Sequence, residues 1–270
     1  MEANRRQWDE RAPLHVTSEF YDLAGFRAGG STLRAIEVEE VGDVAGRELL
    51  HLQCHFGLDT LSWARRGARV TGLDFSESAV EAARALADAE GIDAEFVCAN
   101  VYDAVAALSG RTYDVVYTGI GALCWLPDID RWAATAGALV KPGGSLYVFE
   151  HHPFIGALGM GDGFTDLRFE YAYDSDAQHP MRWDGSGSYA VPDAPTVHNV
   201  AYEWNHSLGA ITSGLIAHGL VLEFLHEHPF MLWQRWPFLV EAEPGIWRLP
   251  AEYEARLPLM FSLRATRPPD

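Results

Sequence analysis

The residues best suited to chemistry gather around one stretch, from Glu48 to Ser76, which reads ELLHLQCHFGLDTLSWARRGARVTGLDFS. Gly57 stands in a turn before a helix-like segment, and Asp74 follows seventeen positions later at the end of an apolar run. A turn at a helix N-terminus presents backbone N–H groups to a ligand, and a carboxylate at the next strand tip accepts hydrogen bonds from ribose hydroxyls. This spacing predicts a site for a nucleotide-type ligand.

The elements that must position these residues follow from the spacing of apolar side chains. Within the stretch we expect a strand that begins near Leu49, a helix over 58–66 that Gly67 ends, and a second strand over 68–73. Alternation of strands and helices of this kind is typical of an α/β fold with a parallel sheet. We expect further elements downstream, namely helices over 77–89, 128–140 and 207–218 and strands over 94–98, 113–118, 145–150, 220–226 and 257–265.

The turn after the first strand argues against a dinucleotide. A pyrophosphate cradle requires G-x-G-x-x-G. The turn here is Gln53-Cys54-His55-Phe56-Gly57, which has no such pattern. An NAD-dependent oxidoreductase is therefore the weaker alternative.

Five features in a fixed order carry a resemblance to class I S-adenosylmethionine (SAM) methyltransferases, and they cover roughly residues 47 to 150. They are a degenerate G-x-G-x-G turn in which Gln53 and His55 replace the first two glycines, Asp74, Asn100, the strand opening Tyr113-Asp114, and the run L-V-K-P-G-G-x-L before a strand. The resemblance implies a seven-stranded doubly wound sheet with helices on both faces and its last strand antiparallel. It also implies SAM as cofactor, with S-adenosylhomocysteine as product.

The resemblance further implies which residues bind SAM. Gln53, Gly57 and Gly119 would form the wall on the methionine side, Cys54 of the turn would also contact the cofactor, and His51 stands where the family usually has an acid. Asp74 would bind the ribose hydroxyls, and an amide at Asn100 would meet adenine, although asparagine is also common in turns after strands. The remaining cofactor residues expected are Phe75, Ser76, Val101, Tyr102, Thr118 and Ile120.

The chain divides into four predicted parts. Residues 1–45 form an N-terminal helical lid with an aromatic side, or an arm packed on the sheet edge; 46–150 form the SAM-binding core; 151–205 form an aromatic-rich insertion that covers the substrate; and 206–270 complete the sheet. An aromatic wall suits a flat or cationic acceptor. We expect substrate contacts from Tyr21, Trp125, His152, Trp183 and Trp204, with a core role as the alternative for Trp125.

Methyl transfer needs a base only when the acceptor atom carries a proton, and histidine titrates in the useful range. We expect His206, His151 and His15, in that order, to be the catalytic candidates. A metal site could draw on His151, His152, His226 and His228 with Glu227 or Asp162, but no recognised ligand spacing is present, and we expect no metal. A catalytically silent SAM-fold binding protein is the non-enzymatic alternative.

Composition and net charge limit the classes of molecule that we expect as partners. The 270 residues carry a net charge of −18, which disfavours nucleic acid and anionic membranes and leaves a small molecule as the expected substrate. Three widely spaced cysteines fit reduced thiols in the cytoplasm, and neither a signal peptide nor a transmembrane helix is expected. The aromatic segment 228–247 is either core or the surface of a homodimer.

Overall fold

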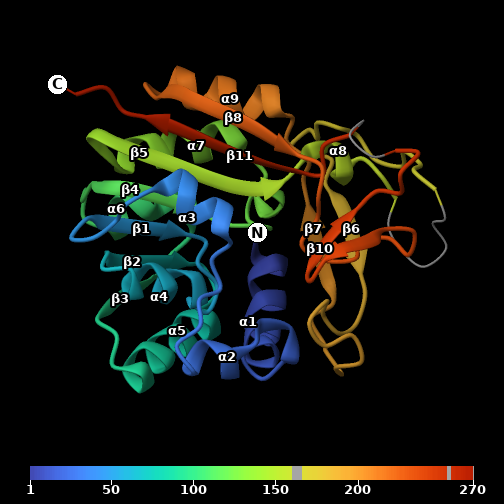
Figure 1. The fold of residues 1–270 in the computed structure, drawn as a ribbon, viewed down its shortest axis with the longest axis horizontal. Coiled ribbons are helices and arrows are strands. Elements are labelled where there is room, and N and C mark those ends of the chain that lie inside the picture. The colour runs from blue at the N-terminus through green and yellow to red at the C-terminus, as the bar shows by residue number, and fades with distance from the viewer. Residues whose placement is uncertain (160–165, 254–256, 270) are drawn as a thin grey trace.

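A seven-stranded sheet organises the protein (Figure 1). The computed structural model describes residues 1–159, 166–253 and 257–269. The strands lie in the order β3-β2-β1-β4-β5-β11-β8, and β11 runs antiparallel between β5 and β8. This is the predicted doubly wound sheet. Its strands are β1 (Glu48–Leu52), β2 (Arg69–Asp74), β3 (Ala94–Cys98), β4 (Tyr113–Thr118), β5 (Val140–His151), β8 (Val221–His228) and β11 (Met260–Thr266).

Helices cover both faces of the sheet because side chains along each strand alternate between the two faces. Leu50 and Leu52 pack in a core cluster with α6, α7 and α9, whereas Leu49 packs in a second cluster with α3 and α4. The helices in chain order are α3 (Ala35–Val41), α4 (Leu58–Arg65), α5 (Glu77–Glu90), α6 (Ala104–Ala107), α7 (Ile129–Leu139) and α9 (Leu208–Ala217), with short 3-10 turns η2 (Val101–Asp103) and η3 (Leu123–Trp125).

Two strands begin three residues or more away from the predicted position, and the other predicted strand boundaries differ by at most two residues. β5 begins at Val140 rather than 145, because Val140 already pairs with Tyr113 of β4 and the Gly143 N–H bonds the Arg267 carbonyl. The last strand begins at Met260 rather than 257. Both differences lie at the ends of strands, where the spacing of apolar side chains does not fix the boundary.

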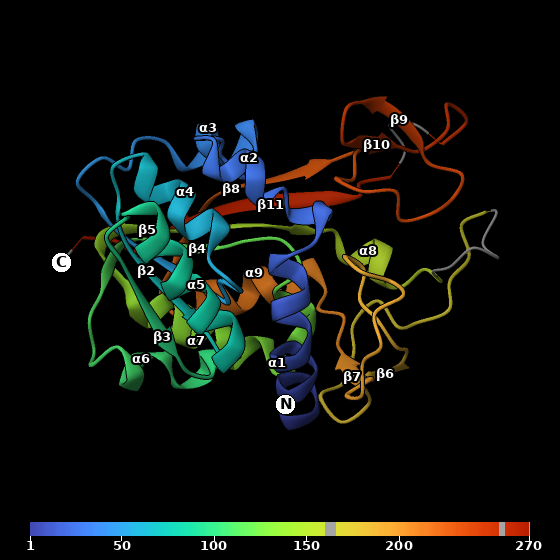
Figure 2. The same ribbon diagram turned by 90° about the horizontal axis from the view of Figure 1, so that it is seen from below.

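The N-terminal segment forms α1 (Glu2–Val16), η1 (Glu19–Tyr21) and α2 (Leu23–Arg27). The buried side of α1 is largely polar, with Asn4, Gln7, Arg11, Ala12 and His15, and the lid role predicted for the segment stays a prediction. Figures 1 and 2 both show α1 between the carboxyl ends of the parallel strands and the segment that carries β6 and β7.

The region after β5 contains α8 (Pro153–Gly156) and the antiparallel pair of β6 (Met181–Asp184) and β7 (Val200–Glu203). The expected loop residues Gly161, Asp162 and Gly163 lie outside the described residues. Farther on, β9 (Val240–Glu243) pairs with β10 (Ile246–Arg248).

The aromatic segment 228–247 contributes to the core. Met231, Trp236 and Leu239 are buried in the cluster that contains Leu49, and the Trp236 indole N–H donates to the Gly159 carbonyl at 2.8 Å. The segment therefore has an internal packing role. Within the described residues, no helix combines the length and the apolar character needed to cross a membrane.

Candidate active site

The turn between β1 and α4 has the backbone of a glycine-rich loop. Gln53 has φ 59°, His55 has φ 52° and Gly57 has φ 83°, so all three lie in the left-handed region. L-residues with side chains enter this region at a cost of roughly 1–2 kcal/mol each. The two positions that the resemblance aligns with glycines therefore keep a glycine-like conformation despite their side chains.

The contacts of the turn explain why Gly57 alone remains a glycine. A Cβ at Gly57 would lie 2.8 Å from the Phe96 ring and 3.0 Å from the Ala83 Cβ. Gln53 donates from Nε2 to the Ala122 carbonyl at 2.7 Å, while its buried Oε1 has no partner. The Cys54 side chain is buried in the core, so Cys54 can offer a ligand only its backbone.

Asp74 lies at the tip of β2 beside this turn. Its Oδ2 accepts the His55 N–H at 2.8 Å and its Oδ1 accepts the Ser76 N–H at 2.9 Å. Each oxygen keeps a second lone pair for a hydroxyl donor. Burial raises the pKa of Asp74 to about 6. From α1, Asp9 accepts the Ser76 hydroxyl at 2.8 Å, so the lid helix reaches the predicted ribose site.

The residues predicted at adenine form a compact turn after β3. The Asn100 Oδ1 accepts the Tyr102 N–H at 3.0 Å and caps η2, which is the turn role considered as its alternative. Tyr102 uses its hydroxyl to bridge the Asp128 N–H and carbonyl at 2.8 and 3.0 Å. Val101 is buried in the core and Phe75 is half-buried. Adenine contact at this turn stays a prediction.

The tip of β4 contributes a second free polar atom. The buried Thr118 Oγ1 has no hydrogen-bond partner, and Gly119 follows it. His51, on β1, bonds Thr60 Oγ1 through Nδ1 at 2.8 Å, and burial lowers the pKa of His51 to about 3. The imidazole is therefore neutral, and its Nε2 faces Gly119 at 3.6 Å from the position a Cβ would occupy there.

Glu150, near the end of β5, holds the loop after β4 and was not singled out from the sequence. Its carboxylate accepts the N–H groups of Gly121, Ala122 and Leu123 at 2.7, 2.7 and 3.1 Å, and that of His151 at 2.7 Å. The signal available in the sequence was an acid in an otherwise apolar strand, SLYVFE. Ile120, in the same loop, is partly exposed.

Aromatic side chains from distant segments meet above the turn, and we call this group the aromatic cluster: Trp8, His15, Tyr21, His55, Trp125 and Tyr189. Trp8 packs edge-on against His15, His55 and Trp125 with ring centroids 5.7, 5.2 and 5.2 Å apart. The hydroxyls of Tyr21 and Tyr189 are hydrogen-bonded. The structure thus brings together the predicted residues His15, Tyr21 and Trp125, and it adds His55 and Tyr189.

His15 has one free nitrogen in this cluster. Its Nδ1 lies 2.9 Å from the His55 Nε2, while its own Nε2 is buried without a partner. Burial lowers the pKa of His15 to about 4, so the ring is neutral near pH 7. Sequence reasoning ranked this histidine third.

Three predicted contact residues have structural partners instead. The His206 Nε2 bonds the Leu126 carbonyl at 2.7 Å, and burial lowers the pKa of His206. His152 accepts the Phe154 N–H through Nδ1 at 3.0 Å and contacts Glu227 through Nε2 at 2.9 Å. The Trp204 indole donates to the Ala177 carbonyl at 3.1 Å. These bonds give the three side chains a structural role, and their contact with a substrate stays a prediction.

His151 is the last residue of β5, and Trp183 lies in β6. The His151 Nε2 is buried without a partner, and burial lowers the pKa of His151 to about 3. The Trp183 ring packs on Tyr171 with centroids 5.7 Å apart. Over the described ranges no group of three His, Cys, Asp or Glu side chains is placed to hold a metal ion, and Asp162 falls outside those ranges.

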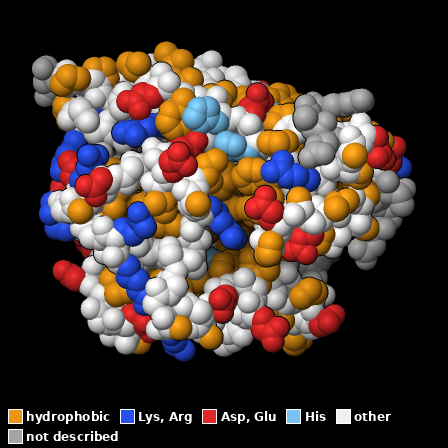
Figure 3. Space-filling view, in the orientation of Figure 1, with side chains coloured by type: hydrophobic (Ala, Val, Ile, Leu, Met, Phe, Trp, Pro, Cys, Tyr) orange, Lys and Arg blue, Asp and Glu red, His pale blue; other side chains and the backbone are white. Residues whose placement is uncertain are grey.

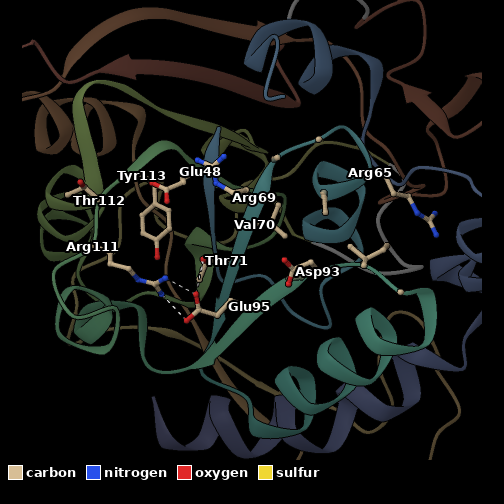
Figure 4. Close-up of a pocket in the computed structure, with 16 residues that line it drawn as sticks. Glu48, Arg65, Arg69, Val70, Thr71, Asp93, Glu95, Arg111, Thr112 and Tyr113 are labelled. Atoms are coloured by element: carbon tan, nitrogen blue, oxygen red, sulfur yellow. Dashed lines mark hydrogen bonds and ion pairs between the residues drawn. The ribbon is translucent and has the colours of Figure 1, made fainter. Parts of the chain in front are cut away.

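A cavity of about 760 Å³ lies at the opposite end of the strands (Figure 4). It is lined by the first residues of β1, β2, β3 and β4, and Glu95 there is held by Arg111 at 2.8 and 2.9 Å. Ligands of open parallel sheets bind at the carboxyl ends. In Figure 3, hydrophobic side chains gather in a hollow at the middle of the face, where Figure 1 has α1 beside the strand ends.

Comparison with known proteins gives the same assignment for the core. Residues 49–144 match the family model described as a methyltransferase domain. A ubiquinone biosynthesis O-methyltransferase from Saccharophagus degradans is 32% identical over 145 residues, which are 53% of this chain and 55% of that protein. The chain spans about half the length of this curated relative.

Solved structures extend the likeness of the fold. A putative SAM-dependent methyltransferase from Listeria monocytogenes is 17% identical with a TM-score of 0.57, over 86% of this chain and 96% of that one. The DhpI protein, in a complex with S-adenosylhomocysteine, is 17% identical with a TM-score of 0.55, over 100% of this chain and 97% of that one. At this identity the likeness shows the fold.

Proposed function

We propose that this chain is a class I SAM-dependent methyltransferase that transfers the methyl group of SAM to a nitrogen or oxygen atom of a small molecule, and the match of residues 49–144 to a methyltransferase domain supports this. The single observation that carries the proposal is the turn from Gln53 to Gly57 with its three left-handed residues, directly hydrogen-bonded to Asp74. This backbone is shaped for a ligand, although two of its three left-handed residues have side chains.

The free polar atoms around the turn fit the cofactor. The Gln53 Oε1 and Thr118 Oγ1 are buried without partners on the side where the methionine portion would bind. Buried polar atoms in folded proteins nearly always have partners, so unpartnered ones require an explanation such as a ligand. We propose that these two residues and Gly119 contact the methionine portion and that Asp74 binds the ribose. Asn100, Val101, Tyr102 and Phe75 would surround adenine.

SAM, when bound, supplies an activated methyl group on a sulfonium. The protein must bring donor and acceptor together and exclude water, and orientation of this kind can contribute ~7 kcal/mol or more. α1 and the region after β5 cover the strand ends, and the aromatic cluster walls the space with rings. Rings favour a flat acceptor and attract a positively charged sulfonium.

The acceptor atom is the finer part of the proposal. Aromatic or amine-bearing compounds suit the ring-lined wall, and the relative from Saccharophagus degradans carries the name of an O-methyltransferase, which supports oxygen. The three cysteines are free thiols, which is consistent with action in the cytoplasm.

We propose that His15 accepts a hydrogen bond from the substrate group that receives the methyl. If the His15 Nε2 accepts this bond, the His15 Nδ1 must carry the proton and donate to the His55 Nε2. A His15→Gln variant should bind S-adenosylhomocysteine as the wild type does and lose about 10²-fold in kcat/KM. His206→Gln is the comparison, since its ring bonds a backbone carbonyl. Equal turnover of wild type and His15→Gln would remove His15 from the mechanism, and His151→Gln would then be tested.

The experiment that tests the function is calorimetric titration with SAM, S-adenosylhomocysteine and NAD. The proposal expects binding of both sulfur compounds, no binding of NAD, and formation of S-adenosylhomocysteine when aromatic or amine acceptors are added. Absence of SAM binding would overturn it. Binding without turnover on any acceptor of a broad panel would favour the catalytically silent SAM-fold protein, which the replaced glycines at Gln53 and His55 leave as the second candidate.

A further inference from the structure

Arg235 is a partly buried arginine near the carboxyl end of β5, and among the described residues its guanidinium has no ion-pair partner. The Arg235 Nε is buried and has no hydrogen-bond partner. The one side-chain hydrogen bond of Arg235 to the described residues runs from Nη2 to the Ile155 carbonyl of α8 at 3.2 Å. Its carbon Cζ also lies 5.1 Å from the centre of the Trp236 ring. Most of its five N–H donors are therefore left without a protein acceptor.

A buried charge of this kind is costly unless an anion compensates it. Elsewhere in this protein arginines near the interior have acceptors: Arg65 bonds two carbonyls and Glu90, and Arg11 bonds three carbonyls. Within the described part of the chain no carboxylate lies within 4 Å of Arg235. Arg235 differs from Arg65 and Arg11 because most of its N–H donors have no hydrogen-bond acceptor among the described residues, although the charge of Glu203 acts on it.

Arg235 lies near the carboxyl end of β5, which is the side of the sheet where we propose that the methyl acceptor binds. Ile155 follows His151 and His152 closely at the carboxyl end of β5. Beside burial, the positive charge of Arg235 contributes to the lowered pKa of His151, whose Nε2 is also free. Burial raises the pKa of Glu203 at the end of β7, and Arg235 opposes that rise. Arg235, His151 and Glu203 therefore lie near one another at the end of the sheet that the insertion covers.

We propose that the methyl acceptor carries a carboxylate group and that Arg235 binds it. This inference rests on the proposed function, since it identifies a group on the substrate of that same site. A planar carboxylate matches the fork of N–H donors on a guanidinium. One guanidinium neutralises one negative charge, so Arg235 matches a carboxylate monoanion and would leave the second charge of a phosphate dianion uncompensated near Glu203. The His151 Nε2 is then available to a donor group on the same molecule.

The test is thermal unfolding of the full-length protein with a panel of small aromatic and aliphatic monocarboxylates, each paired with its uncharged primary amide. 4-Hydroxyphenylacetate and 4-hydroxyphenylacetamide are one such pair. Each compound is measured with and without S-adenosylhomocysteine. At least one carboxylate should raise the melting temperature of the wild type more than its amide does. Arg235→Gln should abolish that preference, and Arg235→Lys should retain part of it because the charge remains.

The binding of S-adenosylhomocysteine to all three proteins is the control. If the Arg235 variants still bind S-adenosylhomocysteine, they are folded. If the wild type does not bind S-adenosylhomocysteine, the result counts against the proposed function and not against the acceptor carboxylate. If no carboxylate stabilises the wild type more than its amide, or if Arg235→Gln keeps the preference, the acceptor carboxylate is overturned. A melting temperature of ligand-free Arg235→Gln at or above that of the wild type supports a binding role, because replacing an arginine with a structural role would lower the melting temperature.

Discussion

Gln53 and His55 show at the scale of single residues that other residues can replace the glycines of a motif while the turn keeps its left-handed backbone conformation. Both have left-handed φ values in the turn, and both keep side-chain contacts, Gln53 with the Ala122 carbonyl and His55 with His15. Strained residues of this type persist when the surrounding structure holds them, and they concentrate at functional sites.

The strain at Gln53 can be measured by comparing two variants. Gln53→Gly and Gln53→Val both remove the bond to Ala122, but only valine is penalised at φ 59°. We expect Gln53→Val to be the less stable by about 1 kcal/mol, since the steric penalty of valine exceeds the entropic cost of glycine. Urea unfolding would measure the difference. Equal free energies of unfolding would contradict a left-handed backbone at this position.

Asp74 should make cofactor affinity depend on pH. Its pKa is raised by burial to about 6, so the carboxyl gains a proton as the pH falls through that value and loses an acceptor site for ribose hydroxyls. We expect the affinity for S-adenosylhomocysteine to weaken from about pH 7.5 to about pH 5. Calorimetry at several pH values would follow it.

Asp74→Asn is the matched control for this titration. It should bind S-adenosylhomocysteine more weakly at pH 7.5, by on the order of 1–3 kcal/mol, and show a flatter pH profile. An unchanged affinity in Asp74→Asn would refute the ribose assignment, and an equally steep pH profile would place the titrating group elsewhere.

At the scale of elements, α1 and the insertion form one connected cover over the strand ends. The Asn4 side chain bonds the N–H and carbonyl of Tyr202 in β7 at 2.8 and 2.7 Å, as a neighbouring strand would. Glu10 accepts the N–H groups of Val197 and His198, both at 2.7 Å. Polar side chains of α1 thus form hydrogen bonds with backbone N–H and C=O groups in a region that has little regular secondary structure.

Arg11 should be the strongest link between these two elements. Its guanidinium donates to the carbonyls of Gly185, Gly187 and His198 at 2.8 to 3.0 Å. Arg11→Met would keep the aliphatic stem and leave three carbonyls unpaired. We expect a loss of about 3 kcal/mol in the free energy of unfolding and faster proteolysis within 185–198.

Arg6→Met on the same helix is the control for Arg11→Met. The Arg6 side chain is 59% exposed and pairs only with Glu2 on the helix surface, so stability should change by less than about 0.5 kcal/mol. Similar losses in the free energy of unfolding for the two variants would mean that the hydrogen bonds of Arg11 do not stabilise the contact between α1 and residues 185–198.

For the whole molecule, the net charge of −18 sets how stability responds to salt. Self-repulsion destabilises the compact state and is screened as the Debye length shrinks from about 30 Å at 0.01 M to about 10 Å at 0.1 M. We expect the melting temperature to rise over that range of sodium chloride at pH 7, measured by circular dichroism. A melting temperature that falls with salt would show that attractive ion pairs outweigh the repulsion.

The sequence alone determined the order of strands and helices and the position of the turn and of Asp74, because apolar periodicity and local turn chemistry are encoded over short stretches. It also predicted a SAM-binding core over 46–150, and residues 49–144 match the model of a methyltransferase domain. Helices and strands of this core appear within a few residues of their predicted bounds, as with α5 at Glu77–Glu90 against 77–89.

Only the tertiary structure decided which side chains meet. His15 rather than His206 has a free nitrogen at the turn, Glu150 holds the loop after β4, and Arg235 lacks an anion, and each fact depends on partners far away in the chain. His55 and His15 are forty positions apart, and Tyr21 and Tyr189 are separated by 168. Local patterns carry no record of such pairs, because hydrogen bonding and burial are settled by packing between elements and not by the spacing of residues within one.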